Sequence, residues 1–460
     1  SDLTKESEFD HPVDEHSYPG AQAFLSGSSV AKYFIWDGIR ALDYLVTRKE
    51  VDVSRIGITG RSGGGTQSAY IAALDDRIHA AAPECWVTNY RRIIQSIGPQ
   101  DGEQNLYHFI YNGLDIPDFL IARAPKPAMM ITTTNDFFSI QGAIETEKEV
   151  SRVYKAFGKS GHFQRVEDFG VHQNTKQNRE AMYAFFQEHL DNPGNSEDEE
   201  VNYLTGEELK VTPTGQLATS LGSETLFSLN RKETEKLEAR LDISRDDIKT
   251  HLSAVITSAK TMSGYKGPEN LAPPVLTGKY KKEGFLIEKC FVQGQGDYVI
   301  PFVYFIPDGT ADNILIYLHP DGKMADPASH KEMEWFARQG FVVLAPDLLG
   351  TGETYPLDFV GDAYIDNVSL NIWFTSTLIN KSIAGIRARD VSQPVRLAEQ
   401  RFGKKDIYAL AKEEMGPVLL HAAAFDEKVK KIALVKPYSS YISIAMNRYY
   451  NTKYILNVIP

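Results

Sequence analysis

The chain has 460 residues, of which 42% are hydrophobic and 24% are charged, and its formal net charge at pH 7 is -12. These proportions are those of a globular protein and exclude disorder throughout, while the length allows two to four domains. The acidic balance argues against binding to nucleic acid, whose phosphates would be repelled. No apolar run is long enough to span a membrane. The two cysteines, Cys85 and Cys290, match no metal-ligand spacing, and we expect neither a metal nor a cofactor.

The first 190 residues alternate between helical and extended patterns. The stretch from Ser1 to Glu15 is polar and acidic and lacks the order of a secretory leader, so no signal peptide is expected. Apolar spacing predicts a helix over 31–46, capped by Ser28 or Ser29. Strands are expected at 55–60, 80–83, 127–134 and 163–169, and further helices at 66–74, 145–157 and 177–190. This alternation is typical of a parallel sheet in an α/β protein.

A linker and a second α/β unit follow. Residues 191–200 (DNPGNSEDEE) have the composition of a linker, and 232–260 is expected to be mainly helical. Strands are then predicted at 285–292, 298–306, 313–318 and 341–345, with a helix over 333–339. We therefore divide the chain into a first unit (1–190), a linker and helical bridge (191–275) and a second unit (276–460).

An internal repeat relates the two units. The hexapeptide Gly38–Asp43 (GIRALD) recurs as Gly385–Asp390 (GIRARD), and the segment after Arg55 aligns with the one that begins at Asp406. In this alignment Ser62 corresponds to Glu413. The glycines around Ser62 are also replaced in the second copy. The second unit therefore cannot hold a serine hydrolase site of the kind that the first unit suggests.

Residues 60–64 (GRSGG) fit the pattern G-x-S-x-G between a predicted strand and a helix of small residues. A nucleophile elbow has this context, because its sharp turn strains the serine and requires small neighbours. Ser62 is then the nucleophile. The N–H of Gly63 would be the first oxyanion-hole donor, worth about 3 kcal/mol of transition-state stabilisation. The alternatives are a plain Gly-rich turn or a phosphate loop, but a phosphate loop would have a lysine after the glycines.

The catalytic partners should follow in the order serine, acid, histidine, each just after a strand. Asp136 ends the strand over 127–134 and is the predicted acid; its alternative role is a turn or cap residue. His172 follows the strand over 163–169 and is the predicted general base, with a surface histidine as the alternative. Asp168 is a weaker candidate acid because it lies within the strand. His162 lies at the opposite edge of the sheet.

Other residues are expected near the same rim. Arg61 and Trp86 are predicted to bind substrate, and Trp86 could stack on a sugar ring or equally belong to the core. The histidines His11 and His16, with Tyr18, precede the first helix, and a role for them near the site is the weaker expectation.

These motifs resemble the acetyl xylan esterase-like α/β-hydrolases, especially the long tandem form of polysaccharide-degrading bacteria. The resemblance covers most of residues 10–190, and its motifs are HSYPGAQ (16–22), YFIWDGIRALDYL (33–45), GITGRSGGGTQSA (57–69), ND (135–136) and VHQ (171–173). It implies an esterase that removes acetyl or similar small acyl groups from plant glycans, with Ser62, Asp136 and His172 as its triad. It also implies a periplasmic or extracellular location and an acetylated polysaccharide or oligosaccharide as the binding partner; the oligomeric state stays open.

The chain departs from the family pattern, because the strands that normally precede the elbow are missing in the first unit. The second unit has those strands but ends before any acid or histidine. We expect either a fragment cut at both ends or, less readily, two halves that complete one sheet. Two other functions compete with the esterase: a prolyl oligopeptidase-like serine peptidase, which shares the elbow and residue order, and a non-catalytic carbohydrate-associated scaffold.

Overall fold

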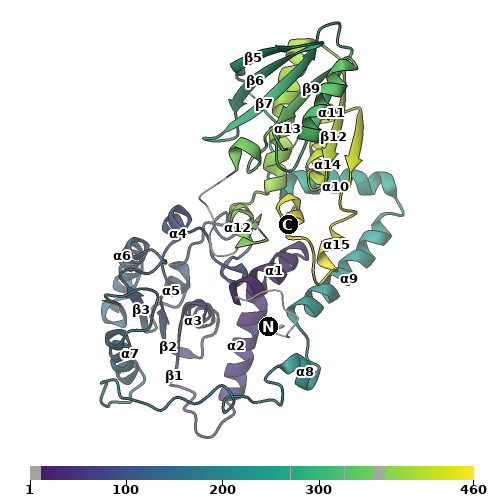
Figure 1. The fold of residues 1–460 in the computed structure, drawn as a ribbon. Helices are drawn as coiled ribbons and strands as arrows, with labels where there is room; N and C mark the ends of the chain where they lie inside the picture. The colour runs from purple at the N-terminus through teal and green to yellow at the C-terminus, as the bar shows by residue number, and fades with distance from the viewer. Residues whose placement is uncertain (1–11, 270, 326, 356–363, 367) are drawn as a thin grey trace. The chain divides into compact units, whose positions relative to one another are not determined.

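A computed structural model describes residues 12–269, 271–325, 327–355, 364–366 and 368–460. The described chain forms two compact units (Figure 1). They divide mainly between Leu229 and Asn230, although Phe24–Gly27 belong to the second unit and Tyr364 to the first. The expected bridge over 232–260 is therefore part of the second unit. It is mainly helical, as expected, and consists of two helices, α9 (Leu226–Ser244) and α10 (Ile248–Met262). No described helix is both long and apolar enough to cross a bilayer.

The first unit contains a four-stranded parallel sheet in the order β1-β2-β3-β4. Its strands are β1 (Ile56–Arg61), β2 (Ile78–Glu84), β3 (Ala128–Thr133) and β4 (Phe163–Asp168). Its helices are α1 (Pro12–Leu25), α2 (Val30–Leu45), α3 (Gly63–Leu74), α4 (Tyr90–Ser96), α5 (Asp118–Ala122), α6 (Ile140–Ala156), α7 (Lys176–His189) and α8 (Leu217–Leu221), with short 3-10 turns at η1 (Gly102–Gln104) and η2 (Ser160–His162).

The sheet of the first unit has an apolar core on each face. On one face Leu42 of α2 and Ile71 of α3 pack with Ile56 and Ala81 of the sheet. On the other face, Phe185 of α7 packs against alanine and methionine side chains of β2 and β3. Burial of both faces is what a parallel sheet requires. Because the strands are parallel, the carboxyl ends of β1, β3 and β4 lie at one edge of the sheet.

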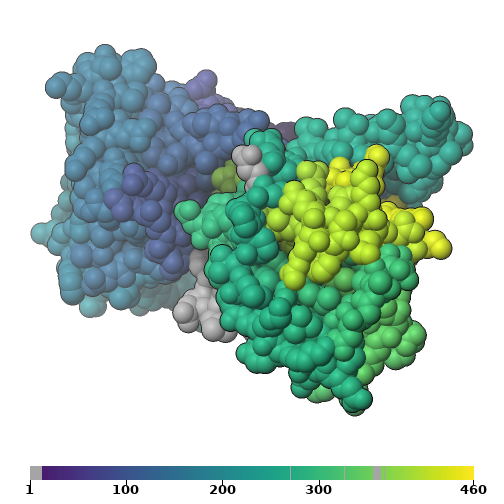
Figure 2. Space-filling view, turned by 90° about the horizontal axis from the view of Figure 1, so that it is seen from above, coloured from purple at the N-terminus to yellow at the C-terminus, as the bar shows by residue number. Residues whose placement is uncertain are grey.

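The second unit contains a seven-stranded mixed sheet in the order β13-β12-β8-β9-β7-β6-β5. Its strands are β5 (Val275–Lys282), β6 (Phe285–Gln293), β7 (Val299–Pro307), β8 (Asn313–Leu318), β9 (Phe341–Pro346), β12 (Asp406–Lys412) and β13 (Lys431–Val435). A separate two-stranded sheet joins β10 (Tyr364–Ile365) and β11 (Val368–Ser369). The helices are α11 (Pro327–Arg338), α12 (Leu370–Leu378), α13 (Ile383–Phe402), α14 (Met415–Asp426) and α15 (Ile442–Ala445), with η3 (Gly352–Thr354) and η4 (Thr452–Asn457). In the space-filling view its green and yellow segments pack into one body (Figure 2).

The internal repeat is present in the three-dimensional structure. In the first unit β1 pairs with β2 from Gly57↔Ala80 to Arg61↔Glu84. In the second unit β12 pairs with β13 from Tyr408↔Lys431 to Lys412↔Val435, which is the same parallel register. Five consecutive pairs thus coincide between the units, because each number in the second set is its counterpart in the first plus 351. This agreement confirms that the two units share one strand–turn–helix plan.

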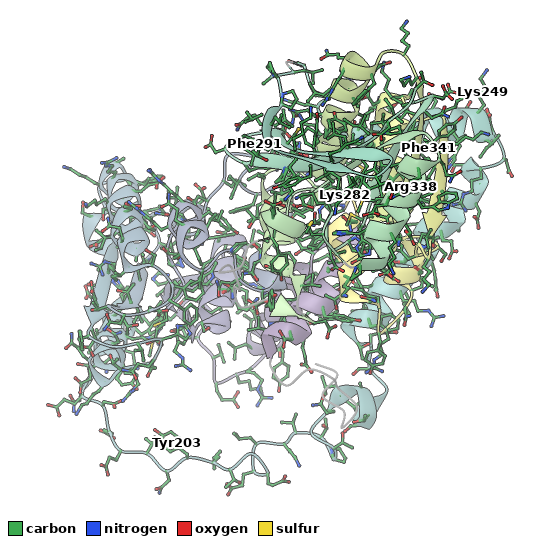
Figure 3. All side chains as sticks on the ribbon, turned by 45° about the horizontal axis from the view of Figure 1, so that its top comes forward. Tyr203, Lys249, Lys282, Phe291, Arg338 and Phe341 are labelled. Atoms are coloured by element: carbon green, nitrogen blue, oxygen red, sulfur yellow. The ribbon has the colours of Figure 1, made fainter. Side chains whose placement is uncertain are left out.

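Most of the predicted helices and strands are found, and the differences between predicted and observed elements have physical causes. The strand predictions in both units are confirmed to within about two residues at each end. The helix expected to begin at residue 145 begins at Ile140, because Ser139 caps it by accepting a hydrogen bond from the N–H of Gly142. The strand β5 was not predicted, since almost all its residues are exposed and it carries no apolar alternation. Between Leu190 and Gln216 the chain forms neither helix nor strand, and Tyr203 in this stretch is 91% exposed (Figure 3).

Candidate active site

The turn between β1 and α3 has the geometry of a nucleophile elbow. Ser62 lies at this turn with φ 60° and ψ -121°, a conformation that a non-glycine residue rarely adopts. Its N–H donates to the carbonyl of Glu84 at 3.0 Å, which fixes the turn to the end of β2. A Cβ at Gly60 would lie only 2.5 Å from the carbonyl oxygen of Gly64, so the turn needs glycine there. Strain held by such surroundings is typical of a functional turn.

The residues after Ser62 begin helix α3 and leave backbone N–H groups free of helical partners. Gly63 is the first residue of α3, where the N–H groups of the first turn have no acceptor within the helix. The partial positive charge of the helix N-terminus lies at the same place. The predicted oxyanion donor is therefore placed where it could stabilise a negative oxygen bound to Ser62.

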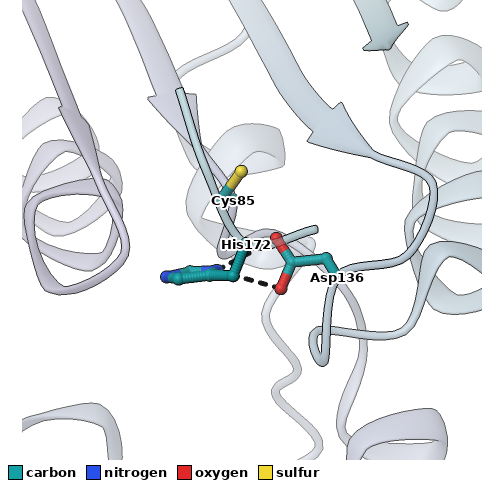
Figure 4. A group of neighbouring side chains, drawn as sticks. All are labelled: Cys85, Asp136 and His172. Atoms are coloured by element: carbon teal, nitrogen blue, oxygen red, sulfur yellow. Dashed lines mark hydrogen bonds and ion pairs between the residues drawn. The ribbon is translucent and has the colours of Figure 1, made fainter. Parts of the chain in front are cut away.

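Asp136 and His172 are brought together at the carboxyl ends of β3 and β4. His172 Nδ1 lies 3.0 Å from both carboxylate oxygens of Asp136 (Figure 4). The Asp136 side chain is only 3% exposed and that of His172 is 20% exposed. The N–H of Phe138 also donates to Asp136 at 3.0 Å. A buried carboxylate that binds Nδ1 fixes the tautomer in which Nε2 is free to act as a base.

The link between Ser62 and this pair is looser. Within the described part of the chain, Ser62 Oγ makes no hydrogen bond, and the imidazole ring of His172 is hydrogen-bonded through Nδ1 alone. The neighbouring Arg61 donates from Nη1 to the backbone carbonyl of His172 at 3.5 Å. Catalytic hydrogen bonds are often long or unformed in a substrate-free enzyme. The structure therefore assembles the acid–base half of the predicted triad and places the serine at the same sheet edge.

Cys85 lies directly beside the acid–base pair. Its Sγ and the nearest ligand atoms of Asp136 and His172 all lie within 4.8 Å of one another (Figure 4). The thiol is buried and lies 3.7 Å from Thr133 Oγ1. Burial, followed by the charge of Asp136, raises the pKa of the Cys85 thiol to about 12. The thiol is thus held protonated at neutral pH and adds no second negative charge to the site.

The preceding residue, Glu84, is a second buried carboxyl group near the site. Asn174 Nδ2 donates to Glu84 Oε2 at 2.6 Å, while Oε1 is buried without a hydrogen-bond partner. Burial raises the pKa of Glu84, which the charges of Arg61 and Arg179 partly offset. The pairing of Glu84 with Asn174, 90 positions further along the chain, has no local signal in the sequence.

The structure corrects the prediction that Trp86 binds substrate. The side chain is 2% exposed, and its Nε1 donates to Gln104 Oε1 at 2.8 Å. A ring that stacks on a sugar needs one exposed face, so the predicted contact with substrate is replaced by the core role. Arg61 is exposed beside the elbow and stays available to a substrate.

Asp168 and His162, which the sequence ranked below Asp136 and His172, make their hydrogen bonds outside the acid–base pair. Asp168 is turned toward its own strand end, where it accepts a hydrogen bond from the N–H of Phe169 at 2.8 Å. His162 lies at the start of β4 and contacts the carbonyl of Pro125 at 2.8 Å. His11 lies outside the described residues.

His16 belongs to a buried ionic cluster that sequence reasoning did not find. Its Nδ1 lies 3.0 Å from Asp101 Oδ2 and 3.1 Å from Glu103 Oε2. Burial alone would lower the pKa of His16, but the two carboxylates raise it to about 10. Burial, and then the charge of Glu103, raise the pKa of Asp101. Glu103 reaches the elbow, because its Oε1 is 3.7 Å from where a Cβ on Gly63 would lie.

The fold and this site define the first unit as an α/β protein with a serine elbow and an aspartate–histidine pair. The family model of acetyl xylan esterase matches residues 31–113, which include α2, the elbow and β2. This match confirms, for that segment, the resemblance to acetyl xylan esterase-like hydrolases. Asp136 and His172 lie beyond it.

Single relatives are more distant. YtaP of Bacillus subtilis, provisionally named a hydrolase, is 27% identical over 181 residues, which are 37% of this chain and 57% of the relative. A protein of Bacteroides fragilis, provisionally named an acetyl xylan esterase, is 15% identical with a TM-score of 0.34, over 42% of this chain and 54% of the other. A glucuronoyl esterase of Solibacter usitatus is 19% identical with a TM-score of 0.30, over 35% and 48%. The chain thus spans only about half the length of these relatives.

Proposed function

We propose that the first unit is a serine esterase that removes acetyl, or similar small acyl, groups from plant polysaccharides or oligosaccharides. The observation that carries the proposal is the buried Asp136–His172 pair, which lies at the same sheet edge as the strained Ser62. The match to the acetyl xylan esterase family over residues 31–113 supports the substrate class. A periplasmic or extracellular location is part of the proposal, because acetylated plant polysaccharides are too large to enter a cell.

The proposed reaction passes through an acyl-enzyme. His172 Nε2 takes the proton of Ser62 Oγ as the oxygen attacks the ester carbonyl, and the Gly63 N–H donates to the resulting oxyanion. His172 then protonates the departing sugar hydroxyl, which leaves the acetyl group on Ser62. Water attacks this ester while His172 takes its proton, and His172 then returns a proton to Ser62 Oγ as the acyl bond breaks and acetate is released. Asp136 holds the imidazole tautomer and stabilises the imidazolium throughout.

The second unit has no part in this chemistry. Glu413 occupies the position of Ser62, and a carboxylate at an elbow cannot form the acyl ester that the mechanism needs. The aligned elbow also carries Ala411 and Met415 where the first unit has Gly60 and Gly64. We infer a structural or carbohydrate-associated role for this unit.

Hydrolysis of p-nitrophenyl acetate by the purified full chain tests the proposal. We expect turnover by the wild type and its loss in Ser62→Ala, with rates falling by three or more orders of magnitude. Ser160→Ala is the matched control, because Ser160 is an exposed serine at the far end of β4 and should leave the rate unchanged. A folded wild type that does not hydrolyse the ester would contradict the proposal.

The alternative reading as a prolyl oligopeptidase-like peptidase is decided by substrate. A peptidase would cleave a prolyl p-nitroanilide, whereas the proposed esterase would release acetate from acetylated xylo-oligosaccharides and leave the anilide intact. Cleavage of the anilide at a rate comparable with the ester would transfer the assignment to the peptidase.

A further inference from the structure

A second cluster of potential ligands in the first unit lies next to the elbow. It joins His16 from α1 with Asp101 and Glu103 from the turn that leads through η1. The Asp101 and Glu103 side chains are only 5% and 3% exposed, and that of His16 is 28% exposed. The ligand atoms of all three residues lie within 4.8 Å of one another. His16 is 85 or more positions from the two carboxylates in the sequence, which is why no ligand spacing revealed the cluster.

The cluster contains more negative charge than its own hydrogen bonds neutralise. Buried carboxylates are rarely tolerated unless they are paired or bound to a metal. His16 Nδ1 is hydrogen-bonded to Asp101 Oδ2, while Glu103 Oε2 is buried and has no hydrogen-bond partner, although it faces the same nitrogen at 3.1 Å. Even with His16 protonated, two ionised carboxylates leave a formal charge of about -1, and a divalent cation that replaces the imidazolium proton would balance both carboxylates.

The distances also suit a common metal ion. A zinc-type ion binds histidine nitrogen and carboxylate oxygen at about 2.0–2.2 Å, so neighbouring ligand atoms in such a shell are roughly 3.0–3.5 Å apart. The two N···O separations in the cluster, 3.0 and 3.1 Å, fall in this range. Imidazole and carboxylate together are ligands for a borderline ion such as zinc rather than for calcium.

The surroundings orient two of the ligands. Asp101 Oδ1 accepts a hydrogen bond from Gln104 Nε2 at 2.7 Å, and Gln104 is itself held by the indole N–H of Trp86. The His16 ring contacts the edge of the Phe34 ring at a centroid distance of 5.0 Å. Ligating carboxylates in metal sites are normally supported by hydrogen bonds of this kind, which fix their orientation.

We propose that His16 Nδ1, Asp101 Oδ2 and Glu103 Oε2 form a binding site for a divalent transition-metal ion of the zinc class. The ion would join α1 to the turn at 101–104 and so brace the segment that reaches Gly63. This role is structural and does not depend on the esterase reaction. It also departs from the expectation of no metal, which rested on cysteine spacing alone.

Metal binding to the full chain tests the site directly. The protein is stripped with a chelator, incubated with zinc, exchanged into metal-free buffer and analysed by elemental mass spectrometry. We expect one zinc ion retained per chain and a rise in melting temperature on addition of zinc. Both effects should be lost in His16→Ala and in Glu103→Gln, whose folding is checked by circular dichroism.

A second three-ligand group, formed by Cys85, Asp136 and His172, provides the matched control. Cys85→Ser should still retain zinc, and cobalt bound to the wild type should show no thiolate charge-transfer band. Gln104→Ala, which removes a support of Asp101, should weaken zinc binding by about 10- to 100-fold. The proposal is overturned if the wild type retains no zinc, if His16→Ala and Glu103→Gln retain it undiminished, or if the cobalt spectrum shows thiolate ligation. The cluster would then be a metal-free ion pair in which the His16 imidazolium is held by the carboxylates of Asp101 and Glu103.

Discussion

Ser62 and Glu413 occupy the same strained turn in the two units. Their φ angles are 60° and 49°, and each residue donates its N–H to the carbonyl that ends the neighbouring strand, Glu84 in one unit and Val435 in the other. The second unit has therefore kept the backbone of the elbow after losing the serine. It has done so although Ala411 and Met415 replace the flanking glycines Gly60 and Gly64. Register with the adjacent strand, rather than glycine content, maintains this turn.

Relief of the strain at Glu413 gives a first prediction. A residue with a Cβ is destabilised by roughly 1–2 kcal/mol in the left-handed region, and replacing it with glycine removes this strain. Glycine in turn loses more backbone entropy on folding, which offsets part of the gain. We therefore expect Glu413→Gly to stabilise the second unit by up to about 1 kcal/mol. Hydrogen exchange of the peptide spanning β12 and α14 measures this locally, as slower exchange.

The matched control for this change is Glu413→Ala, which keeps the Cβ and hence the strain. It should leave hydrogen exchange in the same peptide close to that of the wild type. Neither variant should alter ester hydrolysis. A large loss of activity in either would mean that the second unit contributes directly to catalysis.

The glycines of the active elbow differ in what they tolerate. A Cβ at Gly60 would overlap the backbone of Gly64, with contacts of 2.5–2.8 Å, whereas a Cβ at Gly64 meets nothing within 4 Å. We expect Gly60→Ala to lower the free energy of unfolding by about 3 kcal/mol or more. Gly64→Ala should be neutral or stabilising by up to about 1 kcal/mol, because alanine favours the helix. Thermal unfolding of the two variants side by side checks this; equal melting temperatures would contradict it.

Much of this architecture could be predicted from the sequence, because its signals are local. Apolar periodicity located β1, β3 and β4, and small residues marked the elbow. The order of strands in a parallel sheet then brought Asp136 and His172 to the same edge as Ser62. The alignment of the repeat identifies Glu413 as the counterpart of Ser62 from the sequence alone.

The remaining features depend on long-range contacts that carry no local pattern. Trp86 is buried against Tyr70 and Phe119 and donates a hydrogen bond to Gln104. The His16 cluster is assembled from α1 and a turn far along the chain. The local sequence around His16 carries no sign of the two carboxylates, Asp101 and Glu103, that pack against it in the folded chain. The raised pKa of Cys85 likewise depends on burial and then on the charge of Asp136, which follows a different strand.

Asp136 should matter for turnover rather than for substrate binding. In Asp136→Asn the amide can still contact His172 Nδ1, but it favours the tautomer in which Nε2 carries the proton and cannot accept one. We expect kcat for p-nitrophenyl acetate to fall by roughly 10³- to 10⁴-fold with little change in KM. The comparison is Asp168→Asn, which changes a carboxylate outside the pair and should retain wild-type kcat. A comparable loss in Asp168→Asn would identify Asp168 as the acid instead.

The thiol of Cys85 should be unreactive in the native protein despite its place beside His172. With a pKa of about 12, only about one thiol in 10⁴ is ionised at pH 8, and the thiolate is the reacting form. Labelling by a maleimide should therefore be slow in the native state and rise about tenfold for each pH unit toward 12. In urea, where burial and the Asp136 charge are lost, it should become fast even at pH 8. Because Cys290 is also buried, the labelled residue is identified by peptide mass spectrometry, and Cys85→Ser provides the blank. Rapid native labelling of Cys85 at pH 8 would show that its thiol is ionised, and the acid–base pair would then have a second anion beside it.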